Sequence, residues 1–241
     1  MCIGHGTAVA SVAGGRTKGS AKGAALKIVK TTVGCSNSTS SDILIAAFDW
    51  LAVNAPRGTI INLSFGLDVG LNNCPVGGMT HIGLENAIKK AADSGKIITV
   101  AAGNDNCNTA NYTPTRQSDV FVVGATDNRG LSFGPNTKAS FSKTGSNVSM
   151  FVPGYQVAVL TKEGGIGVDS GTSLSAPHVA GLFAVVCQTV GTYCDSASTQ
   201  EMYQAFRKTS TIGTVASNNG SNRGNNGAAI TRGSSRLITQ R

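Results

Sequence analysis

The chain alternates between short, continuously apolar runs and longer stretches in which apolar residues recur with a helical period. The apolar runs predict buried strands over 26–30, 59–64, 96–101 and 120–123. The helical period predicts helices over 42–53, 82–94, 173–190 and 199–208. Because strands and helices alternate, the pattern predicts an α/β fold with a mostly parallel sheet and helices on both faces.

Two of these helices have recognisable ends. A serine, Ser40 or Ser41, can cap the helix over 42–53, and Gly95 can end the helix over 82–94. On the first of these helices the spacing puts five apolar residues on the face that should meet the sheet, namely Ile43, Leu44, Ala47, Trp50 and Leu51.

Length and charge limit the classes of partner. The chain has 241 residues, which suits a single large domain spanning 1–241. It carries a formal net charge of +8, but its basic residues are scattered rather than clustered, so we expect no nucleic-acid partner. No run approaches the roughly 18 apolar residues of a membrane span. We therefore expect a monomer that acts outside membranes.

The six cysteines favour disulfides over a metal site. No Cys-x-x-Cys pair occurs, and the three histidines (His5, His81 and His178) have no metal-ligand spacing. An even number of cysteines in a chain of this composition favours three disulfides and a secreted protein. From the sequence alone, about 15 pairings of the six remain open.

The most informative segment is Gly-Thr-Ser-Leu-Ser-Ala-Pro-His-Val-Ala-Gly, residues 171–181. It places Ser173 at the start of an apolar helix, where unpaired N–H groups favour developing negative charge. The segment resembles the nucleophile motif of the subtilisin-like serine proteases (the subtilase or peptidase S8 family). Gly-His-Gly-Thr at 4–7 and Val-Ala-Ala-Gly-Asn at 100–104 match two further motifs of that family in the same order.

This resemblance covers nearly the whole chain and is strongest to the branch that includes proteinase K and aqualysin. It implies the three-layer subtilisin-like fold and the activity of a serine endopeptidase. By the same resemblance, Ser173 is the nucleophile, His5 is the general base and Asn104 donates to the oxyanion together with the Ser173 backbone N–H.

The resemblance also implies where a peptide substrate lies. Residues 64–66 and 101–103 would form the walls of the pocket for the P1 side chain, with Tyr112 close by, and residues 37–39 would pair with the peptide as an added strand. The residues implied are Asn37, Ser38, Thr39, Ser64, Phe65, Gly66, Ala101, Ala102, Gly103 and Tyr112. Since these walls are apolar and contain no acidic residue, we expect an aromatic or large aliphatic P1 side chain.

Resemblance narrows the disulfide pairing and argues against a cofactor. Aqualysin-like proteins bond two cysteines that match Cys2 and Cys35. Cys187 and Cys194 flank a helix end and can close a small loop, and Cys74 and Cys107 follow strands expected to be neighbours. The aspartate that holds calcium in proteinase K-like proteins is replaced here by Ser149, so we expect that calcium site to be lost and no cofactor to be needed.

One part of the family pattern is not in this sequence. The catalytic aspartate of subtilases precedes the histidine, yet only Met1, Cys2, Ile3 and Gly4 precede His5. We therefore expect the domain to be incomplete at its N-terminus. The alternative is a catalytically impaired subtilase-fold protein that binds peptides in its cleft.

A second enzyme class has a superficial match. Gly-Leu-Ser-Phe-Gly at 130–134 fits the nucleophile elbow of α/β-hydrolases, with Asp169 and His178 following in the expected order. That elbow needs a preceding strand and a following helix, but glycine, asparagine and proline surround Ser132, which favours a loop.

Overall fold

The computed structural model describes residues 4–35, 39–65, 74, 78–127, 137–191, 193–209 and 228–229. Its helices are α1 (His5–Gly14), α2 (Ser41–Asn54), α3 (Ile82–Asp93), η1 (Thr109–Asn111), α4 (Thr172–Val190), α5 (Tyr193–Ser196) and α6 (Thr199–Thr209). Its strands are β1 (Ile60–Leu63), β2 (Ile97–Ala101), β3 (Phe121–Asp127), β4 (Thr137–Lys138), β5 (Val148–Pro153), β6 (Val157–Leu160), β7 (Ile166–Asp169) and β8 (Ala228–Ala229).

The central sheet is mostly parallel, as predicted. Its order is β1-β2-β3-β5-β8 with every pair on that path parallel, and β4 pairs antiparallel with β3. Strands β6 and β7 form a separate antiparallel hairpin. Every residue of β2 is buried, which is typical of a parallel strand covered on both faces.

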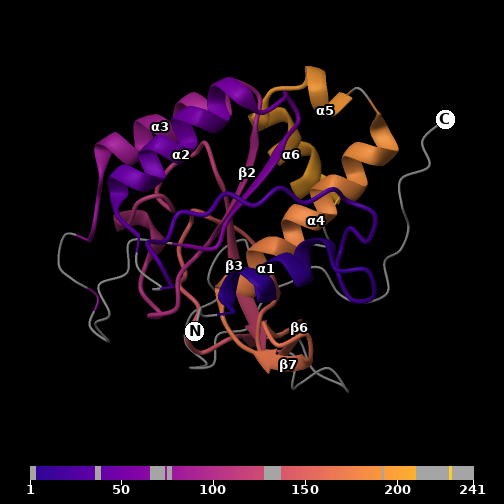
Figure 1. The fold of residues 1–241 in the computed structure, drawn as a ribbon. Coiled ribbons are helices and arrows are strands. Elements are labelled where there is room, and N and C mark those ends of the chain that lie inside the picture. Colours follow the sequence, from indigo (N-terminus) through magenta and orange to yellow (C-terminus); the bar gives the residue numbers. More distant parts are fainter. Residues whose placement is uncertain are drawn as a thin grey trace.

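Helices cover both faces of the sheet, which makes three layers (Figure 1). On one face, α2 and α3 pack against β2 and β3 in a cluster that includes Leu44, Phe48, Leu84, Ile88, Ile98 and Val100. On the other face, α4 and α6 pack against the same strands in a second cluster that includes Phe121, Phe183, Tyr203 and Phe206. The predicted three-layer α/β architecture is confirmed.

Two expectations about local structure are wrong. Residues 26–30 form no strand, and Leu26 and Ile28 are 46% and 74% exposed. A strand needs a hydrogen-bonded neighbour, and within the described residues nothing pairs with the outer edge of β1. On α2, Leu44, Phe48 and Ala52 make the buried face, whereas Trp50 is 58% exposed. The buried face of α2 is therefore rotated about the helix axis relative to the predicted face.

Helix α4 is long and apolar enough to cross a membrane when only length and composition are considered. The helix instead packs between α1 and the central strands, where Ala176, Val179 and Phe183 are completely buried. Its apolar composition is therefore explained by its place in the core.

Two of the predicted disulfides are present. Cys74 bonds to Cys107, and Cys187 bonds to Cys194. Cys35 is also disulfide-bonded, while its predicted partner, Cys2, lies outside the described residues. The first of these bonds connects the chain beyond β1 to the chain beyond β2.

Candidate active site

A cavity of about 230 Å³ opens where β1 and β2 end and where α1 and α4 begin. The carboxyl ends of parallel strands are the usual place for ligands in open α/β sheets. The cavity is lined by His5, Ser64, Phe65, Ala101, Ala102, Gly103, Asn104, Asp105, Tyr112, Thr113, Thr115, Lys143, Thr172 and Ser173. The structure thus brings together the three residues predicted to be catalytic, although they are far apart in the sequence.

Ser173 is held by a reciprocal pair of hydrogen bonds with Ser64. The Ser64 hydroxyl donates to the Ser173 carbonyl at 2.8 Å, and the Ser173 hydroxyl donates to the Ser64 carbonyl at 3.3 Å. The Asn62 side-chain amide donates to the Ser64 hydroxyl at 2.9 Å. Between the described side chains of Ser173 and His5 there is no hydrogen bond, so the serine hydroxyl must rotate before the imidazole can accept its proton.

His5 begins α1, and its ring lies edge-on to the ring of Phe65, with 5.8 Å between the ring centroids. Partial burial lowers the pKa of His5 below its usual value, and the negative charge of Asp169 opposes this by raising it. The burial effect is the larger of the two. His5 is therefore neutral at pH 7, which is the form that can accept a proton.

Asn104 is oriented by Thr172, the first residue of α4. The Asn104 Oδ1 atom accepts from both the backbone N–H and the hydroxyl of Thr172, each at 2.9 Å. The Thr172 hydroxyl in turn accepts from the Gly103 N–H at 3.0 Å. Since Oδ1 is engaged in this way, the amide Nδ2 is the group that remains to donate into the cavity.

The cavity also contains a charged pair that the sequence reasoning missed. Asp105 and Lys143 both line it, so the expectation that no acidic residue contributes to the pocket is wrong. Asp105 directly follows Asn104, and this adjacency was the available signal. Lys143 is brought in from a distant loop, and no local pattern in the sequence marks it.

Comparison with known proteins places this geometry in a family. The model of the subtilase family matches residues 2–229. The chain belongs to the subtilase family. It is 37% identical over 187 residues to alkaline serine exoprotease A of Vibrio alginolyticus, covering 78% of this chain and 32% of that protein. It is 35% identical over 189 residues to an extracellular serine proteinase of Thermus sp. strain Rt41A, covering 78% of this chain and 42% of that protein.

A solved structure agrees with this assignment. The crystal structure of a cold-adapted subtilisin-like serine proteinase superposes with a TM-score of 0.78 at 30% identity. The match covers 95% of this chain and 74% of that one. By contrast, the chain spans about a third to two fifths of the length of the curated relatives named above.

The predicted substrate-binding residues of this subtilase are found in part. Ser64, Phe65, Tyr112 and residues 101–103 line the cavity. Thr39 is not among the lining residues, and its hydroxyl donates to the Thr31 carbonyl at 2.6 Å. Asn37, Ser38 and Gly66 lie outside the described residues.

The surroundings of Ser149 do not fit a calcium ion. The Ser149 hydroxyl accepts from the Arg207 guanidinium at 2.7 Å and from the Val122 N–H at 3.2 Å. A calcium site needs several oxygen ligands and carboxylate charge, whereas here a cationic side chain already contacts the hydroxyl. In the part of the chain that the structure describes, no three His, Cys, Asp or Glu residues gather as potential metal ligands.

The described residues give no support to the α/β-hydrolase alternative, which needs Ser132, Asp169 and His178 to come together. Ser132 lies outside the described residues. His178 sits on α4, and its Nδ1 atom is hydrogen-bonded to the Ser20 hydroxyl at 3.1 Å. Burial lowers the pKa of His178 to about 4, which fits a neutral structural histidine.

Burial and the charge of Asp169 shift the pKa of His5 in opposite directions, which predicts how the pH dependence of activity changes when Asp169 is replaced. Replacing Asp169 by asparagine removes the charge that raises the pKa of His5, so the pKa falls further. Because a general base must be unprotonated, the acidic limb of the kcat/KM profile should move to lower pH. The measurement is the pH profile with a chromogenic peptide. Asp93→Asn, on the far helix α3, is the matched control, and an unmoved limb in Asp169→Asn would contradict the assignment.

The contacts of Thr172 predict a positioning role. Thr172→Val keeps the side-chain shape but removes the hydroxyl that orients Asn104, so we expect kcat to fall roughly tenfold, the equivalent of about one hydrogen bond. Thr172→Ser keeps the hydroxyl and should retain most of the activity. Full activity in Thr172→Val together with a loss in Thr172→Ser would show that the methyl group matters and the hydrogen bond does not.

Proposed function

We propose that this subtilase is a serine endopeptidase in which Ser173 is the nucleophile, His5 is the general base and Asn104 stabilises the oxyanion. The observation that supports it most strongly is the convergence of these three side chains on one cavity at the start of α4. A helix N-terminus favours the negative charge that develops on the carbonyl oxygen during attack.

In the proposed mechanism, the Ser173 hydroxyl turns from the Ser64 carbonyl toward His5 and attacks the scissile carbonyl. His5 accepts the hydroxyl proton and then gives it to the leaving amine. The Asn104 amide and the Ser173 N–H donate to the oxyanion. Water then attacks the acyl-enzyme, and His5 acts again as the base that activates it.

The P1 side chain is proposed to be aromatic or large and aliphatic. Phe65, Ala101, Ala102 and the ring of Tyr112 offer apolar surface in the cavity, which suits a side chain of that kind. We further propose that polypeptides are the substrates, that the protein works as a monomer without a cofactor, and that it is secreted. The disulfides and the extracellular relative from Thermus support secretion.

Labelling with a fluorophosphonate tests the nucleophile directly, because the reagent reacts with activated serines. The purified full protein should be labelled, and Ser173→Ala should not. Ser170→Ala is the matched control, since Ser170 is an exposed serine three residues away and should leave labelling intact. Cleavage of a peptide blocked at both ends would distinguish an endopeptidase from an exopeptidase.

A second candidate function is peptide binding without catalysis. It is favoured by the observation that the Ser173 hydroxyl donates to the Ser64 carbonyl rather than to His5. A wild-type protein that is folded by circular dichroism but remains unlabelled would support this candidate and contradict the proposed peptidase.

A further inference from the structure

Two opposite charges are buried side by side in the candidate P1 pocket. The Lys143 Nζ atom lies 3.2 Å from the Asp105 Oδ2 atom, and the two side chains are only 5% and 9% exposed. Both residues line the cavity that also contains His5 and Ser173. The Lys143 ammonium also lies over the Tyr112 ring, 3.1 Å from its centroid. A substrate side chain that fills this cavity meets all three groups.

The backbone fixes both members of the pair. The Asp105 Oδ1 atom accepts from the Cys107 N–H at 3.0 Å, and Cys107 is tied to Cys74 by a disulfide. The Lys143 N–H donates to the Gly103 carbonyl at 3.0 Å. The two loops that carry the charges are therefore held together independently of the ion pair.

The aliphatic part of the Lys143 side chain can occupy this position because residue 103 is a glycine. Gly103 has a φ of +108°, and a Cβ there would lie 2.7 Å from Lys143 Cε and 2.8 Å from Lys143 Cδ. The stem therefore lies directly against the Gly103 backbone in the wall of the pocket. An alanine at this position would displace it.

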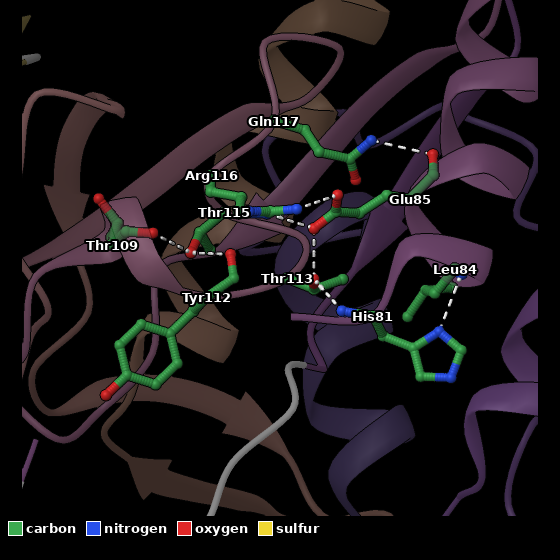
Figure 2. A network of polar contacts seen from close by, with 9 residues as sticks. All are labelled: His81, Leu84, Glu85, Thr109, Tyr112, Thr113, Thr115, Arg116 and Gln117. Atoms are coloured by element: carbon green, nitrogen blue, oxygen red, sulfur yellow. Dashed lines mark hydrogen bonds and ion pairs between the residues drawn. The ribbon is translucent and has the colours of Figure 1, made fainter. Parts of the chain in front are cut away.

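A polar network holds the segment that carries Tyr112 (Figure 2). Arg116 forms a two-pronged ion pair with Glu85 on α3, with N–O distances of 2.6 and 2.8 Å. The Thr113 hydroxyl also donates to Glu85, and the Thr115 hydroxyl donates to the Tyr112 carbonyl at 3.1 Å. These contacts fix the segment that carries Tyr112, and with it the ring that lies against Lys143.

The pair controls which charge the pocket presents. A single charge buried at such a site strongly favours a substrate side chain of opposite sign, because an uncompensated buried charge is costly. Here the ammonium and the carboxylate compensate one another. A charged P1 side chain must give up its hydration without gaining an uncompensated counter-charge, whereas a neutral side chain has little hydration to lose.

We propose that Lys143 and Asp105 form a charge filter in the P1 pocket, which selects uncharged P1 side chains by cancelling the charge of each partner. Lys143 is the specificity-determining member, since without it Asp105 would present a carboxylate to the substrate. This inference rests on the proposed function, in that it takes the cavity next to Ser173 to be the P1 pocket.

Peptide binding to Ser173→Ala tests the filter without requiring catalysis. Dissociation constants are measured by calorimetry for peptides that differ only at P1, in two nearly isosteric pairs: glutamine with glutamate, and norleucine with lysine. We expect the neutral member of each pair to bind about tenfold tighter or more. If glutamate binds as well as glutamine, or lysine as well as norleucine, the proposal is overturned.

Single variants of Lys143 and Asp105, made in the Ser173→Ala protein, should shift the preference in opposite directions. Lys143→Met should raise the affinity for lysine at P1 relative to norleucine by about 10²-fold, and Asp105→Asn should do the same for glutamate relative to glutamine. The double variant, in which both charges are absent, should restore the preference for neutral side chains. Unchanged ratios in the folded single variants would overturn the proposal.

The outcomes separate this inference from the proposed function. If the wild-type protein is not labelled by fluorophosphonate but Ser173→Ala shows the expected binding ratios, the peptidase proposal fails and the charge filter is supported. If the wild-type protein is labelled but charged and neutral peptides bind equally well, the peptidase proposal is supported and the charge filter fails. The isosteric peptides need no change to the ion pair, so equal binding of the charged and neutral members would overturn the proposal even if a single variant does not fold.

Discussion

Replacing His5 by alanine should lower kcat about 10⁶-fold in a protein that also supplies the family's aspartate, the size of loss known for the equivalent change in subtilisin. In the 241-residue chain the expected loss is about 10²-fold, because removal of the aspartate alone already costs about 3 × 10⁴. A serine hydroxyl is a weak nucleophile unless a base removes its proton. His5 faces the same cavity as Ser173, and burial keeps its ring neutral at pH 7. The measurement is single-turnover hydrolysis of a chromogenic peptide ester, which remains sensitive when turnover is slow.

The His5→Ala variant needs a control for folding, since the ring also contacts Phe65. His81→Ala provides one, because His81 caps α3 and does not line the cavity. Activity of His5→Ala within tenfold of wild type, in a folded protein, would show that another group removes the proton and would remove His5 from the mechanism.

Replacing Asn104 by alanine should lower kcat by about 10² to 10³ with little change in KM, a magnitude taken from the matching asparagine of subtilisin. The negative charge on the carbonyl oxygen develops only in the transition state, so a donor aimed at it affects kcat rather than substrate binding. In this structure the two bonds from Thr172 engage Oδ1, which leaves the amide nitrogen of Asn104 to donate into the cavity.

Steady-state kinetics with one blocked peptide substrate separates the two constants. Asn54→Ala is a suitable control, because Asn54 ends α2, does not line the cavity, and its amide donates to the Trp50 carbonyl. A rise in KM with an unchanged kcat would assign Asn104 to ground-state binding, and the oxyanion role would have to be abandoned.

The main elements of the fold could be predicted because their patterns are local. The helix expected over 82–94 is α3, and the run over 96–101 is the completely buried strand β2. Strand β5 was not predicted, because serine and proline interrupt its apolar run and the strand depends on pairing with β3 and β8. The run over 26–30 failed for the converse reason, since apolar composition alone does not supply a neighbouring strand.

The same distinction explains the site. His5, Asn104 and Ser173 each lie in a short motif at the start of a helix or the end of a strand, so the sequence predicts both their identity and their positions. The contribution of Lys143 depends on how two loops pair, and no short segment encodes that arrangement. Thr172 was visible within a motif, but its function emerges only from its contacts with Asn104.

The bond between Cys74 and Cys107 has a consequence for where the protein can work. It closes a segment of 33 residues and ties the chain after β1 to the chain after β2, from which the two opposite walls of the cavity arise. A cross-link of this span stabilises a fold by roughly 4 kcal/mol, and it exists only where thiols are oxidised. In a reducing cytosol the two walls would be held together by noncovalent contacts, such as the pairing of β1 with β2, without this cross-link. In the secreted peptidase that we propose, this covalent link would form only after export, so the cleft would be fully cross-linked only outside the cell that makes it.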